Sequence, residues 1–182
     1  MPYTSQNQRT GDRNQSFHGQ NQSYHGQNQS FHGQRDGRQY GNQKNQTFGE
    51  LAVEVKGLFF KDGLYNEILK MKDTDKLDIL LEETERFVKE LGVQITTSQM
   101  RNIYDKAIKA KDCKSLKMLR PQLAYIAGRD KSDDKKKFLA FLDNVIQSIK
   151  GTEQEEKEQH KNFNVFFEAV VAYHRLHGKN NN

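Results

Sequence analysis

The spacing of apolar residues changes near residue 50, and this change sets what the chain can fold into. Beyond that point apolar side chains recur every three or four positions, which is the period of an amphipathic α-helix. The clearest stripe, with acidic residues opposite, consists of Leu77, Leu80, Leu81, Thr84, Val88 and Leu91. No segment alternates like a β-strand. We therefore expect an all-α fold, a compact bundle of five to six helices over residues 50–182.

Capping side chains predict where several of these helices begin. Three residues have the character of an N-cap, namely Thr96, Ser132 and Thr152. Two of them are followed three positions later by Gln99 or Glu155, which is the spacing of a capping box. Pro121 either kinks a helix or marks the first turn of a new one. Shorter helical segments are expected at 51–60 and 64–71.

The segment around Pro121 carries apolar side chains on two faces. One face holds Leu116, Leu119, Leu123, Ile126 and Ala127, and the other holds Met118, Gln122 and Tyr125. An element that is apolar on two faces is typically packed between neighbours. We therefore expect this helix to lie centrally in the bundle.

Residues 1–49 differ in kind, because they contain a seven-residue polar repeat and almost no aliphatic side chains. Such a tract cannot bury enough apolar area to offset its chain entropy, so a disordered N-terminal tail is predicted. Three roles stay open for it. The repeated His18, His25 and His32 could bind a metal weakly, the aromatic and Arg side chains could stack on single-stranded RNA, or the tail could be an inert or self-associating tether.

Positive charge is concentrated in one central segment. Residues 97–137 contain twelve Lys and Arg against five Asp and Glu, whereas residues 50–96 contain seven against eleven. A concentrated basic stretch is typical of a surface that binds a polyphosphate backbone, although a solvated charged face has the same composition. The candidate phosphate-binding residues are Arg101, Lys106, Lys109, Lys117, Arg120 and Arg129.

No pattern typical of catalysis or of a metal centre is found. The single cysteine, Cys113, can form no internal disulfide, and the sequence contains no phosphate-binding glycine loop, HExxH or CxxC. His160, His174 and His177 lack acidic or thiol ligands at matching spacing, and Glu168 is expected to form a structural ion pair. No apolar run approaches the roughly 20 residues of a membrane span, so we expect a cytoplasmic protein without cofactors.

Three stretches resemble the small subunit of the Csm effector complex, the type III-A CRISPR interference machine. They are Thr97-Ser98-Gln99-Met100-Arg101-Asn102-Ile103-Tyr104, Leu119-Arg120-Pro121-Gln122-Leu123-Ala124-Tyr125-Ile126-Ala127-Gly128-Arg129 and Phe166-Phe167-Glu168-Ala169-Val170-Val171-Ala172-Tyr173-His174. Their order matches the family, and the resemblance covers roughly residues 95–178. The tail and the acidic helix at 73–91 lie outside it.

The resemblance implies a non-catalytic helical bundle, present in several copies that stack along the duplex of crRNA and target RNA. Its partners would be those RNAs, the backbone and large subunits of the ribonucleoprotein, and further copies of itself, in antiviral defence. Arg101, Arg120 and Arg129 stand in matching motifs as contacts to the RNA backbone, whereas the lysines are candidates from charge alone. Tyr125 and Tyr173 could stack on RNA or pack in the protein.

A second interpretation assigns the chain to another class. A helical protein-interaction module with a self-associating low-complexity tail would have a similar composition. It differs in that its partners would be proteins, bound whether or not nucleic acid is present. A third interpretation, a metal-dependent hydrolase, would need a retained metal near His174 or Glu168.

Overall fold

A computed structural model describes residues 46–178, and within them it contains α-helices, two 3-10 turns and no strand. The helices are α1 (Phe48–Phe59), α2 (Leu64–Glu67), α3 (Leu77–Glu90), α4 (Thr97–Lys109), α5 (Cys113–Lys117), α6 (Arg120–Gly128), α7 (Asp133–Ser148) and α8 (Glu153–His177). The 3-10 turns are η1 (Ile68–Lys70) and η2 (Gly92–Gln94). Six helices have nine or more residues, so the predicted all-α bundle is confirmed. The repeat tract with its histidines lies outside the described residues.

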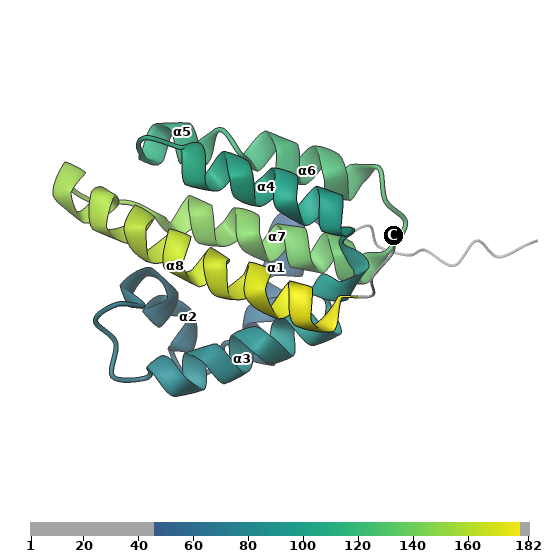
Figure 1. The fold of residues 1–182 in the computed structure, drawn as a ribbon, viewed down its shortest axis with the longest axis horizontal. Helices are drawn as coiled ribbons and strands as arrows, with labels where there is room; N and C mark the ends of the chain where they lie inside the picture. Colours follow the sequence, from purple (N-terminus) through teal and green to yellow (C-terminus); the bar gives the residue numbers. More distant parts are fainter. Residues whose placement is uncertain (1–45, 179–182) are drawn as a thin grey trace, which may run out of the picture. The chain divides into compact units, whose positions relative to one another are not determined.

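The two longest helices, α7 and α8, form the middle of the bundle (Figure 1). α7 packs against α1 and α6, whereas α8 packs against α3, η1 and α4. In Figure 1 the helices α4, α5 and α6 lie along one side of this central pair, and α2 and α3 lie along the opposite side. The basic segment of the sequence is therefore carried on one side of the domain.

The predicted helix starts are confirmed. The hydroxyls of Thr96 and Thr152 accept hydrogen bonds from the backbone N–H three residues later, and the side chains of Gln99 and Glu155 accept from the cap backbone N–H in return. Ser132 caps α7 in the simpler one-way form. Pro121 lies in the first turn of α6, where its missing N–H leaves no helical bond unmade.

The core is built around phenyl rings from several helices. The ring of Phe87 in α3 stacks on that of Phe138 in α7, with centroids 4.8 Å apart. Phe60, at the end of α1, stacks on Phe141 of α7 at 4.7 Å, and its edge meets Phe166 of α8 at 6.3 Å. All five side chains are buried. The cluster takes rings from four parts of the chain, so it joins α1 and α3 to the central pair α7 and α8.

Two packing predictions are wrong. The α6 helix is not central: it packs chiefly on α7, and the side chains of Met118 and Tyr125 are 71% and 61% exposed. Its second apolar face reaches solvent, because single apolar side chains are common on protein surfaces and do not demand burial. Leu77 and Ile108 also lie at the surface, at the ends of their helices.

Gly92 lies where the chain passes closest to the ring stack. A Cβ atom added there would lie 2.9 Å from Cε2 of Phe138 and 3.1 Å from Cγ1 of Val88. The end of α3 can therefore approach α7 only because this residue has no side chain. Gly92 directly follows the last residue of the α3 stripe, Leu91, so it lies where the helix ends and the chain packs against α7.

Two glycine-to-alanine changes should shift stability in opposite directions. Gly92→Ala should lower the free energy of unfolding by about 1–3 kcal/mol, because the methyl group overpacks the Phe138 ring. Gly57→Ala should raise it by about 0.5–1 kcal/mol, because that residue lies in α1 with open space around its Cα. Urea unfolding followed by circular dichroism measures both. A neutral Gly92→Ala would contradict the close packing.

Candidate nucleic-acid interface

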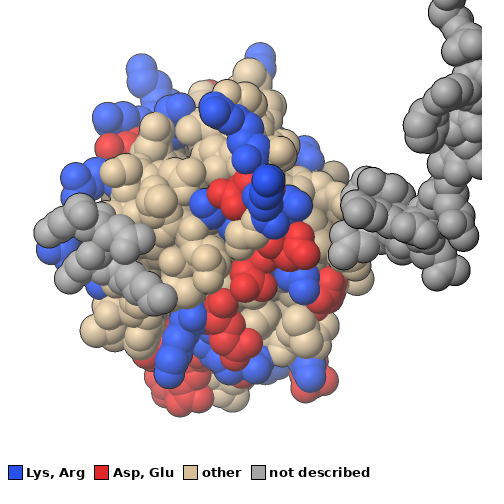
Figure 2. Space-filling view, turned by 90° about the vertical axis from the view of Figure 1, so that its right-hand side faces the viewer, with Lys and Arg blue, Asp and Glu red and all other residues tan. Residues whose placement is uncertain are grey.

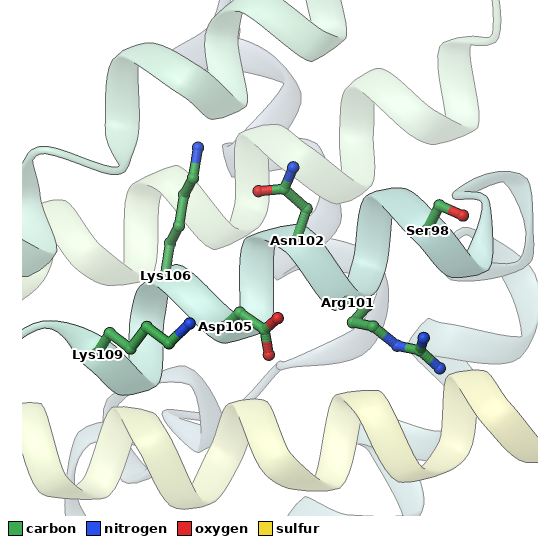
Figure 3. A pocket seen from close by; sticks show the side chains of 6 residues that line it. All are labelled: Ser98, Arg101, Asn102, Asp105, Lys106 and Lys109. Atoms are coloured by element: carbon green, nitrogen blue, oxygen red, sulfur yellow. The ribbon is translucent and has the colours of Figure 1, made fainter.

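Basic side chains line an open groove along the exposed side of α4 (Figure 3). Its lining residues are Ser98, Arg101, Asn102, Asp105, Lys106 and Lys109. Figure 3 shows Asn102 and Lys106 on one edge of the helix, with Arg101, Asp105 and Lys109 on the other. The spacing follows from the helix, because residues three and four apart share a face. Arg101, Lys106 and Lys109, three of the six predicted phosphate-binding residues, thus lie together on α4.

Polar contacts join this groove to α6. The ammonium group of Lys106 donates to Oε1 of Gln122 at 2.6 Å. The amide nitrogen of Gln122 lies 3.5 Å from Oδ1 of Asn102. Gln122, which sequence reasoning placed on a packing face, therefore links the α4 and α6 surfaces through side-chain contacts.

Arg129 and Tyr125 form a pair at the end of α6. The guanidinium of Arg129 donates to the Tyr125 hydroxyl at 2.8 Å, and its carbon lies 5.4 Å from the centroid of the ring. Both side chains are exposed, and they border a small groove that also includes Gln99 and Asp130. An exposed ring beside an unburied guanidinium offers a flat surface on which a base can stack.

Lys117 and Arg120 lie in a different environment. Arg120 forms a two-pronged ion pair with Asp143 of α7, with Nε–Oδ1 at 2.9 Å and Nη2–Oδ2 at 3.2 Å. The Asp143 side chain is only 12% exposed. Lys117 pairs with Glu156 of α8 at 2.9 Å. These two cations hold α6 and α5 to the central helices, and they line a separate groove with Pro121.

Burial separates the twelve cations of residues 97–137 into two groups. Five are half-buried or buried and lie within 3.5 Å of a carboxylate, namely Lys117, Arg120, Lys135, Lys136 and Lys137. The other seven are exposed, and no ion pair joins them to a carboxylate of residues 46–178: Arg101, Lys106, Lys109, Lys111, Lys114, Arg129 and Lys131. Sequence reasoning missed Lys111, Lys114 and Lys131, although the charge count includes them.

Charge is unevenly distributed over the surface. In Figure 2 most Lys and Arg side chains lie in the upper half of the view, and most acidic side chains lie in the lower half. The acidic residues of α3 contribute to this difference, namely Asp78, Glu82, Glu83, Glu85 and Glu90. The side of α4 is therefore more positively charged than the side of α3.

The remaining candidate residues have local structural partners. Tyr173 packs against the core, where burial raises the pKa of its hydroxyl. His174 is buried and hydrogen-bonds the carbonyl of Ile95 at 2.8 Å, and His177 contacts Glu85 at 2.7 Å. These histidines do not converge with His160, and no group of three metal-ligating side chains occurs among residues 46–178.

Two further expectations concern single side chains. Glu168 is exposed, and no cation of the described chain pairs with it, so the predicted structural ion pair is absent. The Cys113 thiol donates to the carbonyl of Glu156, and burial raises its pKa.

No helix in the described part combines the length and apolar character needed to cross a membrane.

Comparison with known proteins places this chain in a family. The family described as Csm2 Type III-A matches residues 74–180, from just before α3 through α8. The match begins some twenty residues before the stretch on which the resemblance was recognised, so it includes the acidic helix α3. No curated protein and no solved structure matches the chain. Because the match covers more than half of the 182 residues, the chain belongs to the Csm2 family, the small subunit of the type III-A CRISPR Csm complex.

Proposed function

We propose that this subunit binds the phosphate backbone of the crRNA–target RNA duplex through its exposed, unpaired cations. They are Arg101, Lys106, Lys109, Lys111, Lys114, Arg129 and Lys131, and they are named here the free cation set. One observation carries the proposal: within residues 97–137, every half-buried cation has a carboxylate partner and every exposed one lacks it. Exposed cations without partners are available for phosphate oxygens.

The dimensions of α4 suit this role. Arg101 and Lys109 are eight residues apart on a regular helix, which is a rise of about 12 Å. That distance spans about three or four successive phosphates of a single strand, at roughly 3.4 Å of axial rise each. Lys111 and Lys114 extend the same run of charge beyond the helix end. Contacts of this kind fix position on RNA without reading its sequence.

The cations that pair with carboxylates support the RNA-binding surface without contacting RNA themselves. Arg120 and Lys117 anchor α6 and α5 to the central helices, and α6 in turn positions Gln122, Tyr125 and Arg129. They are positioning residues, because their charges are already matched by Asp143 and Glu156. Tyr125 adds a stacking surface for an unpaired base.

We further propose that the subunit is non-catalytic and acts by assembly with other Csm subunits and further copies of itself. The side chains with catalytic potential support this. His174 is bonded to a backbone carbonyl, His177 contacts Glu85, and the pKa of Cys113 is raised rather than lowered. A raised pKa disfavours the reactive thiolate.

Neutralising the α4 groove should weaken RNA binding and reduce its dependence on salt. We expect Arg101→Gln, Lys106→Gln and Lys109→Gln together to lower the slope of log Kd against log salt by about 2, at roughly 0.7 per phosphate contact. Fluorescence anisotropy with a labelled single-stranded RNA, over a range of KCl concentrations, measures the slope. The matched control is Lys61→Gln, Lys76→Gln and Lys89→Gln, which changes the same net charge outside the groove.

The control separates contact from net charge. An equal loss of slope in both triple variants would mean that binding follows overall charge, and would overturn the assignment of α4 as the contact surface. An unchanged slope in the α4 variant would do the same.

Arg120 should behave as a structural residue. Arg120→Ala leaves the buried carboxylate of Asp143 without its partner, so we expect a loss of about 1–3 kcal/mol in the free energy of unfolding. Arg101→Ala, at an exposed site, should change stability by less than about 0.5 kcal/mol. Urea denaturation compares the two. The paired replacement Arg120→Met with Asp143→Leu should recover most of the loss, because it removes both charges.

A stable Arg120→Ala protein that no longer binds RNA would contradict this division of roles. In that case Arg120 would belong with the contact residues and not with the anchors.

A further inference from the structure

A second basic groove lies between α1, α2 and α7, away from the free cation set. Its lining includes Lys56, Tyr65, Lys70, Asn144, Ser148 and Lys150, and it shares no residue with the groove on α4. The three lysines come from three places in the chain: α1, η1 and the turn between α7 and α8. We name it the Lys56 groove.

The charge of the Lys56 groove is not balanced within the groove. None of its lining residues is an Asp or Glu, whereas four other surface grooves of the described chain each include at least one. Glu67 forms an ion pair with Lys70 at 3.9 Å, in which the lysine side chain is 65% exposed and the glutamate side chain 19% exposed. At that length, and with the ammonium group in solvent, the pair leaves the charge of Lys70 largely available.

Lys56 is held at the groove by an aromatic ring. Its ammonium nitrogen lies 3.7 Å from the centroid of Tyr65, and the residue is half-buried. No carboxylate of residues 46–178 forms an ion pair with it. Burial without a counterion lowers the pKa of Lys56. A bound anion would therefore supply the charge partner that this ammonium lacks.

The groove is already ordered around that ammonium. The Tyr65 hydroxyl lies 2.7 Å from Oδ1 of Asn144 and 2.6 Å from Oγ of Ser148, which fixes the ring under Lys56. The backbone of Lys150 exchanges two hydrogen bonds with the side chain of Gln159, at 3.0 and 2.9 Å. The ring beside Lys56 and the backbone at Lys150 are thus held in place before any ligand binds.

We propose that the Lys56 groove is a second phosphate-binding site, distinct from the α4 surface. The ammonium groups of the three lysines and the side-chain amides of the groove can donate to phosphate oxygens, and a phosphate offers several acceptors and up to two charges on one centre. The phosphate belongs either to a polynucleotide strand or to a free phosphorylated small molecule. A strand held there would allow one subunit to contact RNA on two faces.

NMR of the full-length ¹⁵N-labelled chain tests the proposal with two probes, inorganic triphosphate and a short single-stranded RNA. The protein carries Arg101→Gln, Lys106→Gln and Lys109→Gln, so that the α4 groove does not mask the result. We expect saturable shifts of the amide signals from Gln147 to Gly151. Replacing Lys56, Lys70 and Lys150 by Gln should weaken the Kd at least about tenfold, and Lys89→Gln should leave it unchanged.

The probes identify the source of the phosphate. Shifts with RNA alone assign the groove to a polynucleotide, and shifts with triphosphate indicate that a free phosphorylated molecule suffices. Absence of saturable shifts with both probes overturns the proposal, and so does an equal affinity in the variant without the three lysines. Because the α4 groove is neutralised throughout, failure here leaves the proposed function on α4 untouched.

Discussion

Four parts of the chain meet at a stack of phenyl rings, which joins α1 and α3 to the central helices α7 and α8 that support the rest of the bundle. Phe87 and Phe138 lie face to face, and Phe60 and Phe141 repeat the arrangement beside them. The stack fixes α7 in the middle of the bundle, and α1 and α6 both pack against α7. Gly92 completes it, because any larger side chain would meet the Phe138 ring. The basic helices are thus mounted on a rigid support.

Burial then decides what each cation can do. An ammonium or guanidinium that is partly removed from water needs a carboxylate, since an unpaired buried charge costs several kcal/mol. Arg120 and Lys117 obtain theirs from the central helices, and in doing so attach α6 and α5. Cations farther out keep their hydration and need no partner, which leaves them available for phosphate. Lys56 departs from this pattern, being half-buried beside a ring with no carboxylate partner in the described chain.

Much of the fold could be predicted from the sequence, because its signals are local. Thr96, Ser132 and Thr152 begin helices where their spacing indicates, and four members of the predicted α3 stripe are buried, namely Leu80, Thr84, Val88 and Leu91. The position of α6 could not be predicted, since periodicity shows which faces are apolar but not how many are covered. The candidate site was predicted from charge and from motif resemblance, and neither distinguishes paired from unpaired cations. Asp143, which separates them, lies in another helix and is recognisable only in three dimensions.

Lysine footprinting can show whether the exposed, unpaired cations on the side of α4 contact RNA. The chain is acetylated with and without bound RNA, and the modification of each lysine is quantified by mass spectrometry. We expect protection of Lys106, Lys109, Lys111, Lys114 and Lys131, with Lys76 and Lys89 on the acidic side modified equally in both samples. Protection of Lys76 and Lys89 with continued modification of the lysines of α4 and α5 would contradict it.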